Sequence, residues 1–563
     1  MHFFKLYFKV ISTLFFVILF FSTLQAKNVD KFNDGKIASN YFSGILLLKD
    51  NQHNESYKFL KKLNGLEDVH PNFSIKYLNS MVILGKIEEA YKYSKKLERK
   101  KLDSFDSNLI IGVFHLKNED YDLAQKYFEK LREKSYLSLN KFISNSLIHW
   151  SSLKYLDLNS ASIKIDSMEE GFGNFKLIQR SFLHCFFDSK KTDNFFKSIT
   201  SNSEIDYSRY NYFYANYLVN TGKIEAGKKI LKKTIKNNPR NLLNNQFLID
   251  LENSKKRSIF NCKNQNHIIA EIFYITANAL SSQGLYSTSN FYLSLAKQLN
   301  EKFYSFDSLL AENYFETENF KEARKVLKTI ETFGKTYYWY SAKQFSRILL
   351  KQKKKEKAIK SLKNAYSKLS KKNVYDSFDF AEFLKNNEKF DDSIKYYSEV
   401  LGIIDKNHPL YPEATDGRGV AFERMGDWEK AEKDLLASLK VKPNQAYVIN
   451  YLAYSWIEKS IKIEKSLEML KKANSLKEND PYIIDSLGWA LYKLQKYKEA
   501  KEYLQRAVQL MPADPIVNDH YGDVLWKNGN EIQARYYWNY VLGLEDTEEK
   551  LKNNLKIKLI SGL

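Results

Sequence analysis

The chain has few of the residues that break helices or cross-link a fold. Its 563 residues include 20 glycines, 8 prolines and 2 cysteines. So few glycines and prolines fit a chain built from helices. Hydrophobic residues make up 44% and aromatic residues 15%, which is ample for a buried core, so intrinsic disorder is excluded. A chain of this length exceeds one compact core, and we expect several domains or an array of repeats.

Long hydrophobic runs are missing except at the N-terminus. There, two lysines precede an apolar run from Val10 to Phe21, and Ala26 follows shortly after. The run is shorter than the about 20 residues that a membrane span needs, and the pattern is typical of an export signal. We therefore expect cleavage after Ala26 and export of the mature chain. The alternative is an uncleaved anchor over Val10–Leu24 in the inner membrane.

Clusters of catalytic or metal-binding residues are also missing. The 9 histidines are scattered, and no two lie closer than His53 and His70, so none forms the helical pair that ligates zinc. The tripeptide Gly334–Thr336 looks like the end of a phosphate-binding loop, but Thr329 stands where that loop needs its first glycine. We therefore expect no enzymatic activity, no metal and no cofactor.

Negative charge is scarce relative to positive charge, and the formal net charge is +21. Lysines are spread over the whole chain, and the densest run, Lys351–Lys360, falls at a predicted turn between two helices. Such runs usually stay hydrated, so a solvated surface is the simpler interpretation. Contact with an acidic partner is the alternative. Nucleic acid is not expected as a partner, because an exported protein rarely meets it.

What the sequence does contain is a period of 34 residues. Such a period is typical of stacked helix-turn-helix hairpins, which bury their apolar faces against one another. Small residues recur where the two helices of a hairpin should cross, and large apolar residues recur where neighbouring hairpins should meet. The matched pairs are Pro481 and Pro515, Gly488 and Gly522, Ala500 and Ala534, and Leu504 and Trp538.

This pattern resembles the tetratricopeptide repeat family. The resemblance implies an all-α, right-handed superhelical solenoid, here of about fourteen hairpins. It is strongest in the C-terminal third, where NYLAYSWIEKS, DSLGWALYKL and NDHYGDVLWKNGN look like exported tetratricopeptide proteins of proteobacterial cell envelopes. The expected hairpins begin at or near Ile37, Pro71, Phe105, Leu139, Gly173, Ser208, Ala270, Tyr304, Trp339, Val374, Pro412, Tyr447, Pro481 and Pro515.

Interruptions of the period predict how the chain is divided. The clearest one is ENSKKRSIFNCKNQN, which follows Pro239 and is too polar to continue the repeat. The chain end after the last hairpin should be a polar-faced capping helix, as terminal repeats require. We expect a signal peptide (1–26), a degenerate N-terminal superhelix (27–250), an irregular linker (251–269), middle repeats (270–411), closely matching C-terminal repeats (412–546) and the capping helix (547–563).

The two cysteines, Cys185 and Cys262, fall about two repeats apart in this scheme. Packed helices lie about 8 to 10 Å from each other, so a separation of two repeats exceeds the reach of a disulfide. The sequence therefore predicts two isolated thiols.

In tetratricopeptide proteins the concave groove is lined by positions 2, 5, 9, 12 and 13 of each first helix, and the resemblance implies the same here. Aromatic and acidic side chains at these positions suit an extended peptide or a partner helix with basic or amide groups. The alternative is that the tryptophans pack against the next hairpin and the aspartates pair with lysines. The candidate groove residues are Tyr451, Tyr482, Asp485, Trp489, Tyr492, Lys493, Asp519, Asp523 and Trp526.

The resemblance implies a periplasmic scaffold or adaptor for envelope enzymes. The expected partner is a protein, such as an envelope protease or a cell-wall enzyme, and peripheral association with the membrane is compatible with this role. The lysine and asparagine clamp of cytosolic chaperone-binding members is missing, because Asp485 and Trp489 occupy its positions. A component of polysaccharide export that binds an acidic polymer through lysines is the alternative. No constellation of residues supports a hydrolase in the N-terminal half.

Overall fold

The computed structural model describes residues 35–563 except 64, 136, 169–174, 201–207 and 256. Every regular element among these residues is a helix. The expected signal peptide, residues 1–26, lies outside the described part. Within the described part, no helix combines the length and the apolar character that crossing a membrane requires. The chain divides into two compact units, unit 1 (Met1–Leu369) and unit 2 (Ser370–Leu563).

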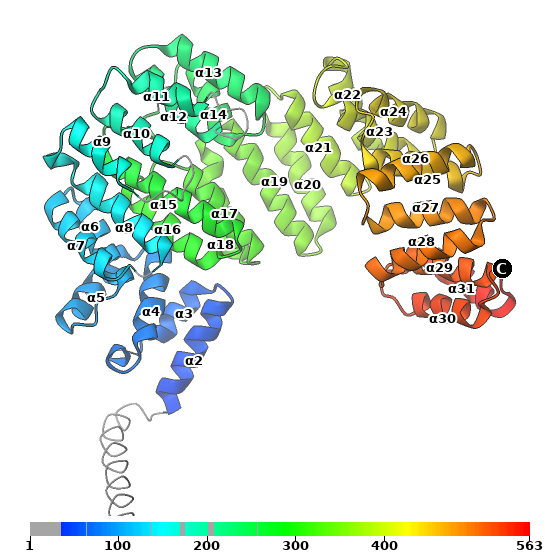
Figure 1. Ribbon diagram of the computed structural model, residues 1–563, viewed down its shortest axis with the longest axis horizontal. Helices are drawn as coiled ribbons and strands as arrows, with labels where there is room; N and C mark the ends of the chain where they lie inside the picture. Colours follow the sequence, from blue (N-terminus) through cyan, green and yellow to red (C-terminus); the bar gives the residue numbers. More distant parts are fainter. Residues whose placement is uncertain (1–34, 64, 136, 169–174, 201–207, 256) are drawn as a thin grey trace, which may run out of the picture. The chain divides into compact units, whose positions relative to one another are not determined.

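The helices form consecutive antiparallel pairs, each with a first helix A and a second helix B (Figure 1). All fourteen expected hairpins are present, which confirms the predicted all-α solenoid. The pairs of unit 1 are α2 (Gly35–Lys49) with α3 (His53–Leu60), α4 (Pro71–Ile83) with α5 (Ile87–Arg99), α6 (Phe105–Lys117) with α7 (Tyr121–Glu133), α8 (Ser138–Ser151) with α9 (Leu158–Asp166), α10 (Phe175–Phe186) with α11 (Thr192–Thr200), α12 (Ser208–Asn220) with α13 (Ile224–Asn237), α15 (Gln265–Ser282) with α16 (Tyr286–Leu299), α17 (Ser305–Glu316) with α18 (Phe320–Ile330), and α19 (Lys335–Lys351) with α20 (Lys355–Lys368).

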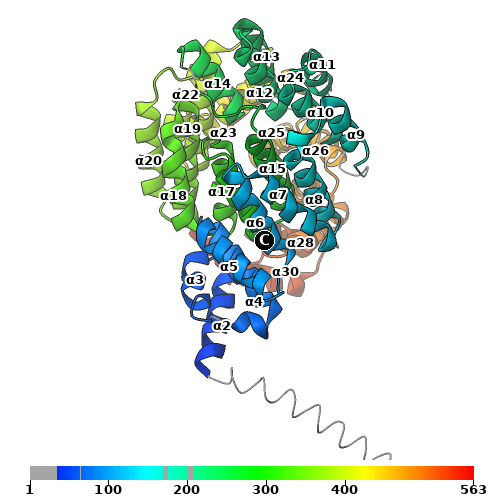
Figure 2. The same ribbon diagram turned by 90° about the vertical axis from the view of Figure 1, so that its left-hand side faces the viewer.

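Unit 1 winds round until later hairpins cover earlier ones. Helix α15 packs against α8 (Figure 2), and α16 packs against α4 and α6, all of which lie far upstream in the sequence. The Asn266 side-chain amide donates a hydrogen bond to the Leu116 carbonyl at 3.1 Å, and Lys117 donates to Gln298 at 2.8 Å. The early and late parts of unit 1 therefore share one hydrophobic core.

The segment between α14 (Leu242–Glu252), a single helix that the period did not predict, and α15 lies inside unit 1. Helix α15 begins at Gln265, within the range expected to be an irregular linker. The prediction of two isolated thiols is wrong, because Cys185 of α10 and Cys262 of this segment form a disulfide with their Cα atoms 5.9 Å apart. The segment turns back onto α10 instead of following the stack, which brings the two cysteines within bonding distance.

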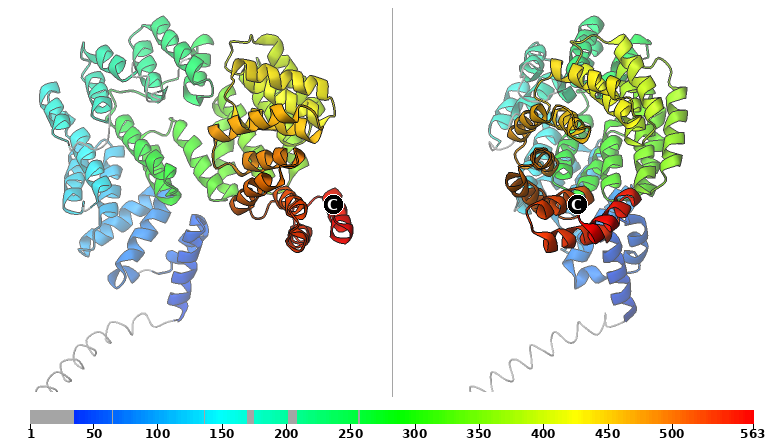
Figure 3. Two further views of the ribbon diagram at one scale, coloured as in Figure 1. Left: turned by 45° about the vertical axis from the view of Figure 1, so that its right-hand side comes forward. Right: turned by 90° about the vertical axis from the view of Figure 1, so that its right-hand side faces the viewer.

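Unit 2 is a regular stack, in which each helix A packs against its own helix B and, after the first hairpin, against the helix B before it (Figure 3). A final unpaired helix, α31, covers the last hairpin. The pairs are α21 (Val374–Asn386) with α22 (Phe390–Ile403), α23 (Tyr411–Arg424) with α24 (Trp428–Val441), α25 (Ala446–Glu458) with α26 (Ile463–Leu476), α27 (Pro481–Lys493) with α28 (Tyr497–Leu510), and α29 (Pro515–Lys527) with α30 (Glu531–Leu542), followed by α31 (Glu549–Ser561).

Two of the A helices in unit 2 begin with the same capping pattern. Asp480 and Asp514 each precede a proline at the start of a helix. The Asp480 carboxylate accepts hydrogen bonds from the backbone N–H groups of Tyr482 and Ile483, and Asp514 caps α29 in the same way. The aspartate satisfies N–H groups that a helix start leaves free, and the proline has no N–H to satisfy, so together they define where the helix begins.

Glycine at position 8 allows the two helices of a hairpin to cross closely. A Cβ atom at Gly488 would lie 2.7 Å from Cγ of Leu504, and one at Gly522 would lie 2.4 Å from Nε1 of Trp538. Both distances are far below van der Waals contact. The recurrence of glycine at this position is therefore explained by lack of space between the helices.

We expect Gly522→Ala to lower the free energy of unfolding of unit 2 by about 1–3 kcal/mol, because the added methyl group must displace the buried Trp538 ring. Gly402→Ala in α22 is the matched control, since a Cβ at Gly402 meets nothing within 4 Å. Urea unfolding of the two variants, followed by circular dichroism, measures the difference. Equal effects at both positions would contradict the steric explanation.

Candidate functional site

The nine candidate groove residues do not form one open surface. Four of the acidic and aromatic ones are buried, and only two of the nine are exposed. Asp485, Trp489, Asp519 and Asp523 are buried, Tyr451, Tyr492 and Trp526 are half-buried, and Tyr482 and Lys493 are exposed.

Asp485 on α27 is held by a histidine of the next helix A. Its carboxylate lies 2.9 Å from Nδ1 of His520 on α29. The imidazole also stacks on Trp489 with ring centroids 3.9 Å apart, and Trp489 stacks in turn on Tyr492. Burial acts to lower the pKa of His520, but nearby carboxylates, Asp485 first, outweigh it and keep this pKa above its ordinary value. The buried histidine is therefore favoured in its charged form, as the partner of Asp485.

Asp519 and Asp523 on α29 are held by a lysine of the final helix. Nζ of Lys558 on α31 lies 2.7 Å from a carboxylate oxygen of each aspartate. The indole N–H of Trp538 donates a further hydrogen bond to Asp523 at 3.0 Å. Burial and the neighbouring Asp519 raise the pKa of Asp523 to about 6. Two carboxylates thus share one buried ammonium group.

These contacts join α27 to α29 and α29 to the final helix α31. The pairs Asp485–His520 and Asp523–Lys558 both link residues 35 positions apart in the sequence. Asp519 and Asp523 pair with a lysine and Trp489 packs against the next hairpin, as the alternative interpretation expects, whereas the partner of Asp485 is a histidine. Binding of a partner by these residues stays a prediction.

The final helix is less polar on its outer side than a capping helix was expected to be. Leu555 and Lys558 of α31 face the last hairpin and are buried. Ile557 and Ile560 lie on the outer side and are 63% and 85% exposed. Helix α31 therefore caps the stack, but its outer surface is partly apolar.

An open cavity lies instead in unit 1, on the A helices around Arg209. The guanidinium of Arg209 on α12 makes a two-pronged ion pair with Glu271 on α15, with both N–O distances at 2.6 Å. It also donates to the Ser305 hydroxyl of α17 at 2.5 Å and lies 3.6 Å from the ring centroid of Tyr274. Three A helices are therefore joined through one cation, which is held rigid by charge-assisted hydrogen bonds.

The cavity around this cation has a volume of about 580 Å³. Tyrosines, asparagines and serines alternate in its wall with aliphatic side chains. The Ser308 hydroxyl is buried and has no hydrogen-bond partner among the described residues. The lining residues are Ser208, Arg209, Tyr210, Asn241, Leu242, Leu243, Tyr274, Ile275, Asn278, Ser305, Ser308, Leu309, Glu312, Tyr337 and Tyr340.

The floor of this cavity is supported by the segment that carries the disulfide. Phe260, two residues before Cys262, is almost fully buried and packs against Phe213, with ring centroids 4.4 Å apart. Arg209 lies over Phe213 and Phe303 of the same aromatic cluster. The irregular segment therefore has a structural role below the cavity.

The sequence contained a signal for this site. Counted from the expected hairpin starts, Arg209, Glu271 and Ser305 all fall at position 2, one of the positions assigned to the groove. Tyr274 and Asn278 fall at positions 5 and 9 of their hairpin. The predicted groove residues all lie in the C-terminal hairpins, where the repeat is clearest, and do not include these five.

Comparison with known proteins identifies the repeat in part of the chain. Residues 347–547 match the family model described as tetratricopeptide repeat. A TPR repeat-containing protein of Pseudomonas aeruginosa is 29% identical over 154 residues, which are 27% of this chain and 25% of that protein. The chain thus matches only about a quarter of that relative's length.

Solved structures of low sequence identity also align. A chain of the APC/C hetero-tetramer Cut9-Hcn1 aligns over 91% of this chain and 94% of its own length, at 12% identity and a TM-score of 0.37. PilF of Pseudomonas aeruginosa aligns over 33% and 85%, at 20% identity and a TM-score of 0.29. MamA from residue 41 onward, from Desulfovibrio magneticus, aligns over 31% and 97%, at 18% identity and a TM-score of 0.27.

The Lys558→Met variant tests the buried charges of unit 2, since it keeps the side-chain length and removes the ammonium group. We expect a loss of about 3–5 kcal/mol of unfolding free energy at pH 8, because two buried carboxylates lose their cation. The loss should be smaller at pH 5. A carboxyl whose pKa is raised to about 6 by folding binds a proton there and no longer needs a cation.

Urea unfolding at pH 5 and pH 8 measures both effects. Lys556→Met, which changes an exposed lysine of the same helix, is the control and should have little effect. A loss of the same size at both pH values would contradict a charged network.

Proposed function

Because residues 347–547 belong to the tetratricopeptide repeat family, and the other described hairpins repeat the same helical pattern, we propose that the protein is a non-enzymatic scaffold of the cell envelope. Tetratricopeptide repeats indicate a protein-interaction scaffold. The more specific proposal is that a protein partner binds through the A-helix face of unit 1. A short segment of this partner enters the cavity around Arg209.

The cavity is the observation that supports this choice of surface. Its tyrosines offer flat contact area at low cost in conformational entropy, and Leu242, Leu243 and Ile275 offer apolar contacts. The Ser308 hydroxyl and the Asn278 amide supply hydrogen-bonding groups beside them. This combination suits a short extended segment that inserts an apolar or aromatic side chain and satisfies its backbone amides.

Two observations support a location outside the cytoplasm. The apolar run of Val10–Phe21 followed by Ala26 has the features of an export signal. The disulfide between Cys185 and Cys262 fits an oxidising compartment, because disulfides are rare where thiols are kept reduced. We therefore propose the periplasm as the compartment. An envelope protease or a cell-wall enzyme would be a partner of the expected kind.

The Asn278→Arg variant tests the cavity as the partner site. Asn278 lines the cavity and is exposed at its edge, so an arginine there should obstruct the site and leave the fold intact. We expect the proteins captured by crosslinking in native envelopes to be lost or reduced at least about tenfold, as for blocking the centre of an interface. Quantitative mass spectrometry of the captured proteins provides the measurement.

Asn364→Arg is the matched control, because it adds the same side chain at an exposed position of helix B α20. Equal capture by the Asn278→Arg variant and the wild-type protein would refute the cavity assignment. If the wild-type protein loses its captured material at high salt, the acidic-polymer alternative is favoured instead. Polyanion complexes weaken steeply with ionic strength.

Export can be tested on the protein isolated from its own cells. We expect the mature chain to begin at Lys27, because cleavage is expected after Ala26.

We also expect Cys185 and Cys262 to react with an alkylating reagent only after reduction. N-terminal sequencing and the mass increase on alkylation measure the two outcomes. A chain that begins at Met1 and sediments with membranes would favour the anchored alternative, and free thiols in the native protein would contradict an oxidising compartment.

A further inference from the structure

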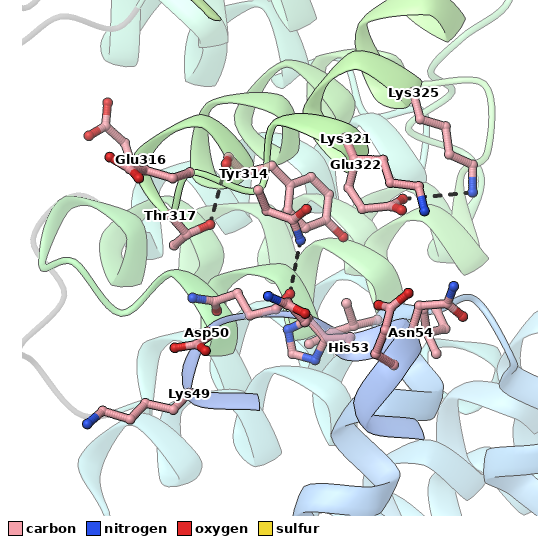
Figure 4. Close-up of a pocket in the computed structure, with 17 residues that line it drawn as sticks. Lys49, Asp50, His53, Asn54, Tyr314, Glu316, Thr317, Lys321, Glu322 and Lys325 are labelled. Carbon is pink, nitrogen blue, oxygen red and sulfur yellow. Dashed lines mark hydrogen bonds and ion pairs between the residues drawn. The ribbon is translucent and has the colours of Figure 1, made fainter. Parts of the chain in front are cut away.

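A second cavity lies where two turns of unit 1 meet, away from the cavity around Arg209. The turn between α2 and α3 lies against the turn between α17 and α18, and the Asn319 side-chain amide donates a hydrogen bond to the Asn51 carbonyl at 3.0 Å (Figure 4). The two turns enclose a space of about 760 Å³, here named the seam cavity. It exists only because unit 1 winds back on itself and brings together residues 268 positions apart.

His53, the first residue of α3, is a buried polar group in the wall of the seam cavity. Its exposed fraction is 4%, and neither ring nitrogen has a hydrogen-bond partner among the described residues. His53 is one of the residues that line this cavity (Figure 4). Burial lowers the pKa of His53 to about 4, so the ring is neutral at physiological pH and offers one nitrogen as an acceptor. A buried acceptor without a donor is costly, and a ligand with an N–H group would satisfy it.

The wall of the seam cavity is acidic, although the chain as a whole is strongly basic. Five carboxylates line it against three lysines, whereas the formal net charge of the chain is +21. Glu55 and Glu322 are half-buried and lie in the first turns of α3 and α18, where the free N–H groups of a helix start favour the charged carboxylate. The nearest cation of Glu322 is Lys325 at 3.9 Å, which is a weak pair.

The arrangement fits an organic cation better than a metal ion. In the described part of the chain, no three histidine, cysteine or carboxylate side chains converge closely enough to hold a metal. The carboxylates are distributed around a space that accommodates several non-hydrogen atoms. An extended cation with N–H donors would reach both the carboxylates and the unpartnered imidazole.

We propose that the seam cavity is a binding site for an organic ammonium or guanidinium group, held by the Glu55 and Glu322 carboxylates and by a ring nitrogen of His53. A free polyamine and a lysine or arginine side chain of a partner offer the same chemistry. The site does not depend on the proposed function, since it shares no lining residue with the cavity around Arg209.

The test is calorimetric titration of the full-length protein with two cations and one anion: spermidine, the peptide acetyl-Ala-Arg-Ala-amide and inorganic phosphate. We expect at least one of the two cations to bind with a stoichiometry of one. The Glu55→Gln/Glu322→Gln variant should weaken this binding at least about tenfold, because it removes both charges and keeps the shape of the side chains. His53→Phe should weaken it as well, since the ring volume remains and the acceptor is lost.

Glu225→Gln is the matched control, because its carboxylate is exposed on α13 of the same unit. Binding of spermidine identifies a free amine as the source, and binding of the peptide alone identifies a partner's side chain. Either result supports the site if the Glu225→Gln and Asn278→Arg variants bind the cation as tightly as the wild-type protein does. The proposal is overturned if neither cation binds, if only phosphate binds, or if Glu225→Gln weakens binding as much as the double variant does.

Discussion

The close crossing of the two helices within each hairpin is the constraint on which the rest of the structure depends. At Gly522 the backbone of α29 approaches the Trp538 ring of α30 so closely that a methyl group has no space. Such an approach buries a large apolar side chain completely and sets the angle at which the next hairpin can pack. Because the hairpins of unit 2 bury their apolar faces against their neighbours, this array is stable as a stack and each hairpin depends on the next.

Charged side chains complete the stack where apolar contacts end. His520 and Lys558 neutralise aspartates of the preceding helix A, in positions where an unpaired carboxylate would be costly. In unit 1 the Arg209–Glu271 pair likewise joins two A helices, but through position 2 of each hairpin, and it borders an open cavity. Buried ion pairs therefore join A helices in both units, and in unit 1 the joint borders an open cavity.

The fold was largely predictable from the sequence, and the site was predictable only in part. Small residues such as Gly488 and Ala500 recur at a fixed spacing because they meet the same neighbours in every hairpin, so the spacing predicts the helices and their pairing. Asp519 and Asp523 follow the spacing equally well, but whether such a carboxylate faces solvent depends on what the next helix carries. Both carboxylates are paired with Lys558, which lies after the last recognisable hairpin.

The sequence by itself determined the helical hairpins, their number and the face of each helix A, because these follow from contacts between residues about one repeat apart or closer. Only the tertiary structure decided which faces stay open. The disulfide of Cys185 with Cys262 joins residues 77 positions apart, and the hydrogen bond between Asn319 and Asn51 joins residues 268 positions apart. Their proximity arises from the accumulated rotation of the stack and from an irregular segment that turns back, and neither quantity is encoded in a local period.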